Sequence, residues 1–70
     1  MKDFDMEVLA RKVSLTREEA AFFAGVGRDT LTKYIKRDEI PHFYVGRDLR
    51  VSRSGLEAWI ETCAVERREI

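Results

Sequence analysis

The chain of 70 residues has few of the residue types on which many architectures and chemistries depend. It contains one cysteine, one histidine, one proline and four glycines, and no apolar run approaches the ~20 residues that a membrane-spanning helix needs. A single cysteine excludes a disulfide framework and suits a reducing compartment, so we expect a cytoplasmic protein. No cluster of potential ligands has the spacing of a metal site, so we expect no metal.

The composition is otherwise that of one small globular domain. Hydrophobic residues make up 44% of the chain and charged residues 37%, which excludes the low-hydrophobicity, disordered class. The first twelve residues mix charges and lack an apolar core followed by a cleavage pattern, so we expect no secretory signal. Seventy residues can bury a single core but not two.

No catalytic constellation is present in the sequence. His42 and Cys63 could in principle form a nucleophilic pair, but Cys63 falls on the apolar stripe of a predicted helix, which favours a buried structural thiol. Gly25 and Gly27 precede a helix, as in phosphate-binding loops, yet no βαβ unit or lysine-serine signature surrounds them. We therefore expect neither an enzyme nor a cofactor.

The charges are unevenly distributed along a chain whose formal net charge is zero. Residues 28–53 contain seven basic and four acidic residues, a balance of +3, whereas residues 1–19 balance to −1 and residues 54–70 to −2. A partner that docks on one face responds to the local field rather than to the total charge. The middle of the chain is therefore suited to an anionic partner.

Two helical patterns divided by a glycine turn occupy residues 15–40. The first pattern begins with a capping box, because the Thr16 hydroxyl and the Glu19 carboxylate can each accept from the other residue's backbone amide. Gly25 suits the left-handed residue that ends a helix. Phe22 is expected to stay partly exposed or to meet the N-terminal segment. The inner stripe consists of Ala20, Phe23 and Ala24.

The second helix is predicted from about residue 28 to residue 37 and is amphipathic. Its apolar face consists of Leu31, Tyr34 and Ile35. The opposite face carries Asp29, Lys33 and Lys36, with Thr32 and Arg37 on its flanks and Arg28 and Thr30 at the edges of the first turn. No large apolar side chain interrupts this outer face. Pro41 ends the helical region, because the residue before a proline avoids helical geometry.

Residues 42–51 are typical of a β-hairpin, for which two registers compete. A two-residue turn at residues 46 and 47 places Phe43 opposite Arg50, whereas a three-residue loop pairs Phe43 with Val51. Only the longer loop gathers four apolar side chains on one face, so we expect that register. It also sets Tyr44 opposite Arg50 on the outer face, where the guanidinium can lie over the ring.

The remaining segments complete a predicted α+β fold. Ser52 or Ser54 can cap a third amphipathic helix whose apolar stripe consists of Leu56, Trp59, Ile60 and Cys63. Residues 13–15 alternate as a short strand does, and Asp3 or Asp5 can cap a marginal helix with Met6, Leu9, Ala10 and Val13 at helical spacing. We expect an arm or short helix over residues 1–12, a winged helix-turn-helix over 13–64 and a charged tail over 65–70.

This arrangement indicates binding to double-stranded DNA. A helix-turn-helix presents its second helix to the major groove, and a following hairpin can reach the adjacent backbone or minor groove. Both elements are basic on the faces that would point toward DNA, with Arg47 at the tip of the hairpin. The candidate DNA-binding residues are Arg28, Asp29, Thr30, Thr32, Lys33, Lys36, Arg37, Tyr44, Arg47 and Arg50.

The chain from residue 15 to residue 61 resembles the small winged-helix modules of the excisionase type, which are related to the DNA-binding heads of MerR-type regulators. The resemblance rests on LTREEAAFFAGV, GRDTLTKYIKRDEIP and VGRDLRVSRSGLEAWIE. It departs from the usual pattern at Gly27, Phe22 and Asp48, where a serine cap, a polar residue and a basic residue are usual. It implies an accessory factor that binds and bends the attachment-site DNA of a mobile element and assists an integrase.

Two alternatives remain open. Only residues 53–70 follow the hairpin, which disfavours a MerR-type dimerisation helix and effector domain, but a small transcriptional regulator of a mobile element would use the same fold. The neutral total charge and the acidic Asp29 and Asp48 also fit a protein-interaction module that has lost DNA affinity. A single module has a small interface, so we also expect cooperative binding of further copies on DNA or help from the integrase. We expect no membrane partner.

Overall fold

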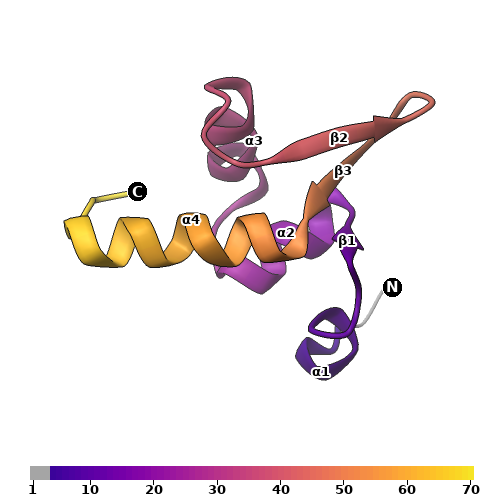
Figure 1. The fold of residues 1–70 in the computed structure, drawn as a ribbon, viewed down its shortest axis with the longest axis horizontal. Helices are drawn as coiled ribbons and strands as arrows, with labels where there is room; N and C mark the ends of the chain where they lie inside the picture. The colour runs from indigo at the N-terminus through magenta and orange to yellow at the C-terminus, as the bar shows by residue number, and fades with distance from the viewer. Residues whose placement is uncertain (1–3) are drawn as a thin grey trace.

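The computed structural model describes residues 4–70, which form four helices and a small three-stranded sheet (Figure 1). In the figure, α4 runs horizontally across the middle of the view, α3 lies above it and α1 below it, and the β2–β3 hairpin projects to the upper right. None of the described helices is long and apolar enough to cross a membrane. The elements are α1 (Met6–Leu9), β1 (Ser14–Leu15), α2 (Arg17–Ala24), α3 (Arg28–Lys36), β2 (His42–Val45), β3 (Asp48–Ser52) and α4 (Arg53–Glu66).

The N-terminal segment contains only a single helical turn, α1. Asp5 caps it by accepting from the Glu7 amide at 2.9 Å, as predicted, while the alternative cap Asp3 lies outside the described residues. Leu9 is the one member of the predicted stripe that is buried. The Phe4 ring packs against Phe22 with centroids 5.3 Å apart, which confirms that Phe22 meets this segment.

The predicted capping box fixes the start of α2. Glu19 donates its amide to the Thr16 hydroxyl at 3.2 Å, and the Thr16 amide donates to the Glu19 carboxylate at 3.0 Å. Burial raises the pKa of the Glu19 carboxyl, but hydrogen bonds from Lys12 and Thr16 outweigh burial and leave that pKa below its ordinary value. Gly25, with φ +72°, ends the helix in the left-handed conformation, as predicted.

The second helix ends for a reason that differs from the predicted one. α3 stops at Lys36, and Asp38 adopts the left-handed conformation with φ +61°. The amides of Asp38 and Glu39 then donate to the carbonyls of Ile35 and Tyr34, which is a Schellman motif. The helix is therefore terminated before Pro41 can influence its backbone. Its apolar face, Leu31, Tyr34 and Ile35, is buried as predicted.

The predicted hairpin register is wrong. The strands are joined by a two-residue turn at Gly46 and Arg47 rather than by a three-residue loop. Gly46 has φ +64°, and a glycine of positive φ at the first position is the pattern of a type II′ turn, whose twist matches that of the strands. The strand pairs are His42 with Val51, Phe43 with Arg50, Tyr44 with Leu49 and Val45 with Asp48.

The observed register divides the apolar side chains between the two faces of the hairpin. Leu49 and Val51 lie on the face that continues into the core, whereas Phe43 lies on the other face and is 45% exposed. Tyr44 is paired with Leu49 and Arg50 with Phe43, so the predicted stacking of Arg50 on Tyr44 is also wrong. Turn geometry prevailed over the gain from cross-strand apolar contacts.

The closing helix α4 seals the core as predicted. Ser52, rather than Ser54, caps it by accepting from the Gly55 amide at 3.1 Å. Trp59 is buried against Tyr34, with ring centroids 5.4 Å apart. The largest fully buried side chains are Leu9, Leu15, Leu31, Ile40, Val51 and Leu56, so every layer of the fold contributes to one core.

The C-terminal residues fold back onto the loop that follows α3. The Arg68 guanidinium lies 2.9 Å from a Glu39 carboxylate oxygen, and that carboxylate also accepts from the Trp59 indole N–H at 3.4 Å. The hydrogen bond from Arg68 lowers the pKa of Glu39. Residues 65 and 66 of the predicted charged tail continue α4, and Arg68 ties the loop after α3 to the end of α4.

Candidate nucleic-acid interface

The outer face of α3 presents an uninterrupted set of polar and charged side chains. Asp29, Lys33 and Lys36 are exposed, opposite the buried apolar face. Thr32 is half-buried, and its hydroxyl donates to the Arg28 carbonyl at 2.9 Å. An open hollow along this face is lined by Asp29, Thr32, Lys33, Lys36 and Arg37. We refer to these five residues as the helix hollow.

One cation of α3 and one at its C-cap lie over the aromatic ring of Tyr34. The Lys33 ammonium lies 5.0 Å and the Arg37 guanidinium 5.3 Å from the Tyr34 ring centroid. Such contacts contribute about 0.5–1 kcal/mol each at exposed sites. Tyr34 itself is only 4% exposed, so it acts as a fixed platform for the basic side chains around it.

The hairpin places its basic residues at and beside the turn. Arg47 occupies the second position of the turn, at the tip as predicted, and is exposed. Arg50 lies three residues further along β3 and is half-buried. Tyr44 is 64% exposed, and its ring meets His42 edge-on with centroids 6.1 Å apart. All three side chains are therefore available to a partner, but Tyr44 and Arg50 lie on opposite faces.

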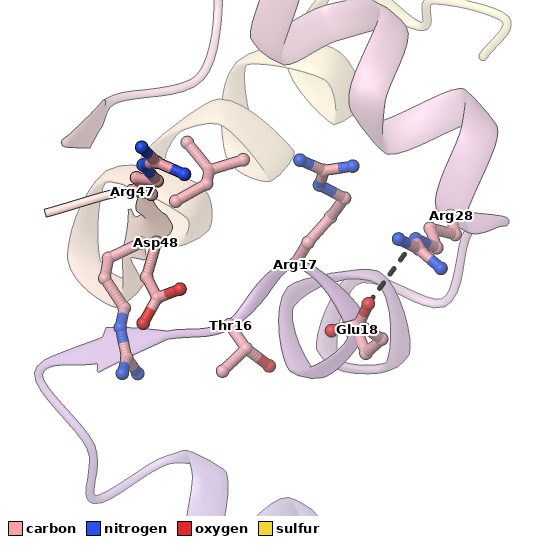
Figure 2. Close-up of a pocket in the computed structure, with 8 residues that line it drawn as sticks. Thr16, Arg17, Glu18, Arg28, Arg47 and Asp48 are labelled. Atoms are coloured by element: carbon pink, nitrogen blue, oxygen red, sulfur yellow. Dashed lines mark ion pairs between the residues drawn. The ribbon is translucent and has the colours of Figure 1, made fainter. Parts of the chain in front are cut away.

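A cavity of about 330 Å³ lies where the hairpin meets the N-termini of α2 and α3 (Figure 2). We refer to it as the arginine cavity, because Arg17, Arg28, Arg47 and Arg50 are among its eight lining residues. The other lining residues are Thr16, Glu18, Asp48 and Leu49. The fold thus brings the predicted site residues Arg28, Arg47 and Arg50 together, and separates them from the helix hollow.

Arg17 was not among the predicted site residues. It lies inside the capping box, between Thr16 and Glu19. One signal could have revealed it: Arg17 is the first residue of α2, and the positive end of a helix dipole favours anions rather than cations. Arg28 occupies the same position in α3. Two helices that both begin with arginine at one cavity indicate an anionic partner.

Among the described residues, no group of three or more His, Cys, Asp or Glu is placed to hold a metal ion. Cys63 is buried and free. The chemistry that the surface offers is hydrogen bonding and charge, concentrated on α3 and on the arginine cavity.

A helix-turn-helix whose second helix is basic and exposed, followed by a projecting antiparallel hairpin, defines a winged helix-turn-helix DNA-binding protein. Residues 14–64 match the family model described as a helix-turn-helix domain, and the chain belongs to that family. Proteins of this class bind DNA and are typically not enzymes. No curated protein and no solved structure gave a significant match.

Proposed function

We propose that the protein is a sequence-specific DNA-binding accessory factor of the excisionase type. In this proposal it binds attachment-site DNA of a mobile element, bends it and directs an integrase, without itself making or breaking bonds. The observation that carries the DNA-binding part is the uninterrupted polar face of α3 beside a hairpin with arginine at its tip. The excisionase-specific part rests on the sequence motifs that resemble that family.

The side chains of α3 and of the hairpin have two different roles in DNA recognition. Lys33, Lys36, Arg47 and Arg50 neutralise backbone phosphates, and the release of counterions then makes the affinity depend steeply on salt. Asp29 can accept from a cytosine amino group. The methyl group of Thr32 can pack on a thymine methyl, because the Thr32 hydroxyl is already bonded to the α3 backbone.

The size of the module sets the affinity it can reach alone. A single small DNA-binding module buries about 600–1,000 Å² of protein surface, at the lower end for specific complexes. Tight occupation of an attachment site then requires adjacent copies bound cooperatively, or contact with the integrase. Wrapping bent DNA around several copies would also repay the energy of bending, which is about 1–6 kcal/mol for a short site.

The experiment that tests DNA binding is a fluorescence-anisotropy titration of labelled duplexes at several salt concentrations. The duplexes are one selected by the wild-type protein from a randomised pool and one of unrelated sequence. We expect the selected duplex to bind tighter, and the double variant Lys33→Ala, Lys36→Ala to weaken both complexes and flatten their salt dependence. The matched control removes two exposed basic residues outside both hollows, Arg11→Ala with Arg67→Asn, and should bind as the wild type does.

Binding that stays equal on the two duplexes, with no effect of the double variant, would contradict the DNA-binding proposal and favour a protein-interaction module. The finer role needs a second assay, in which excision by a candidate integrase is measured with and without the protein. DNA bending together with stimulated excision is expected for an accessory factor. Binding without either effect is the result expected of a transcriptional regulator.

A further inference from the structure

The arginine cavity carries positive charge that the ion pairs of the fold do not neutralise. Four arginines and two carboxylates line it, a balance of +2 in a chain of zero net charge. Among the residues that the structure describes, Arg17, Arg47 and Arg50 form no ion pair within 4.0 Å. In Figure 2 the Arg17 side chain extends between Arg47 on one side and Arg28 on the other. Like charges gathered around one hollow repel each other unless an anion occupies it.

The backbone adds to this positive field. α2 and α3 both begin at the cavity, and the free N–H groups of a helix start attract anions. The start of α2 is already capped by Thr16, but Gly27 gives α3 no side-chain cap. The cavity therefore offers guanidinium groups from three elements, beside a start of α3 that has no side-chain cap.

The Arg28 side chain is held beside the cavity by an ion pair with Glu18. Its Nε lies 3.4 Å from a carboxylate oxygen of Glu18, the residue that follows Arg17 in α2 (Figure 2). Both side chains are about half exposed, so the pair is weak, but it orients the guanidinium toward α2 and the cavity. The cavity and the helix hollow share no lining residue.

We propose that the arginine cavity binds one phosphate group of the DNA backbone, with Arg17 and Arg28 as its ligands and Glu18 as the residue that positions Arg28. From the sequence alone, Arg28 is expected to read a guanine; this inference, which rests on the proposed DNA binding, alters that role. Arg28 contacts the backbone rather than a guanine, and base reading belongs to the helix hollow. A guanidinium fork matches the geometry of phosphate oxygens, which explains arginine rather than lysine at the cavity.

A phosphate ligand and a base reader respond differently to substitution, and this difference supplies the test. Kd is measured for Arg17→Gln and Arg28→Gln on the selected and the unrelated duplex between 50 and 200 mM salt, with Arg11→Gln as the control of equal charge. Removing a phosphate ligand should weaken both complexes by a similar factor, about tenfold. It should also reduce the slope of log K against log salt by ~0.9 for each phosphate that is no longer neutralised.

Glu18→Gln gives an independent readout, because it keeps the size of the side chain and removes the negative charge at the cavity. We expect it to weaken both complexes, although by less than Arg28→Gln does, because Arg28 loses the partner that orients its guanidinium. Combining the two substitutions measures whether Glu18 acts through Arg28. If Glu18 only repelled phosphate, the effects of the two changes would add.

The outcomes separate failure of this inference from failure of the proposed function. If the wild type binds duplex with a salt dependence, and Arg17→Gln and Arg28→Gln bind with the same affinity and the same salt dependence, the cavity is not a phosphate site. If Arg28→Gln weakens only the selected duplex, Arg28 reads a base and the reassignment is wrong. If the wild type does not bind duplex, both proposals fail. Thermal melts of each variant show whether a loss of binding is a loss of folding.

The same cavity chemistry would suit a free phosphate, so a second arm of the experiment distinguishes the two sources. Amide NMR shifts at Arg17 and Arg28 are followed with inorganic phosphate and with chloride at equal ionic strength. We expect weak, millimolar shifts that are lost in Arg17→Gln. Micromolar affinity for inorganic phosphate, with duplex binding insensitive to Arg17, would identify a small-anion site and overturn the backbone assignment.

Discussion

Gly55 provides the sharpest test of how the closing helix is seated. It is the third residue of α4, where alanine would ordinarily be the better helix former by about 1 kcal/mol. A Cβ at this position would lie 2.7 Å from both Cβ and Cγ of Pro41 and 3.2 Å from its Cδ. Carbon atoms in contact lie about 3.5–4.0 Å apart. The proline ring cannot rotate away, so α4 or the start of β2 must move.

These opposing effects give the expected magnitude for Gly55→Ala. Overpacking of this kind costs about 1–3 kcal/mol, and the helix-propensity gain offsets about 1 kcal/mol of it. We expect the variant to be less stable by about 1 kcal/mol, within a range of roughly 0–2 kcal/mol, and 1 kcal/mol lowers the Tm of a domain of this size by about 4–8 °C. Helix propensity alone predicts the opposite sign.

The assay is thermal and urea unfolding followed by circular dichroism, with Gly27→Ser as the contrasting glycine substitution. Gly27 has cap geometry, and its added Cβ would find only Thr30 Oγ1 at 3.9 Å. A serine there should stabilise by a few tenths to 1 kcal/mol by capping α3. Gly55→Ala melting at or above the wild-type temperature would refute the close packing of α4 on Pro41.

Three further predictions concern the core, the C-terminal contact and the hairpin. Trp59→Ala should cost about 3–5 kcal/mol, most of the stability of a 70-residue domain; a variant that keeps the wild-type urea midpoint would show that the ring is not in the core. Glu39→Gln should be less stable than the wild type at pH 7. Because the folded-state pKa of Glu39 is lowered, the carboxylate contributes to the free energy of unfolding at pH values above its unfolded-state pKa of about 4.3. This contribution is lost as the pH falls through the folded-state pKa. A difference in urea-measured stability between the variant and the wild type that persists unchanged at pH 3 would contradict this. Arg47→Gln should weaken duplex binding without altering the melt, whereas a loss of folding would mean that the turn residue is structural.

Local sequence signals predicted the helix boundaries because the forces that set them are local. Thr16 and Glu19 form the capping box within four residues, and Gly25 reverses the chain without strain. The apolar stripes of α3 and α4 identified Tyr34 and Trp59 as core residues, since helical spacing places them on one face. These signals were sufficient to predict a winged helix-turn-helix.

The hairpin register shows where such signals compete. The apolar pattern favoured the longer loop, but Gly46 at the first turn position allowed a two-residue turn, and the strands followed its geometry. The energy of a tight turn and the twist of the strands are not visible in a count of apolar pairs. The error exchanged the faces of Phe43 and Tyr44 and removed the expected stacking of Arg50 on Tyr44.

The sequence by itself determined the succession of helices and strands, the core stripes and the basic outer face of α3, because caps, glycine turns and helical periodicity act over a few residues. Only the tertiary structure decided which residues that are distant in the sequence lie close together. Arg17 and Arg47 are thirty residues apart in the chain and line one cavity, and Arg68 reaches back to Glu39. Such contacts depend on how the helices and strands pack together. The packing of α2, α3 and the hairpin on a shared core decides which charged side chains lie close to one another.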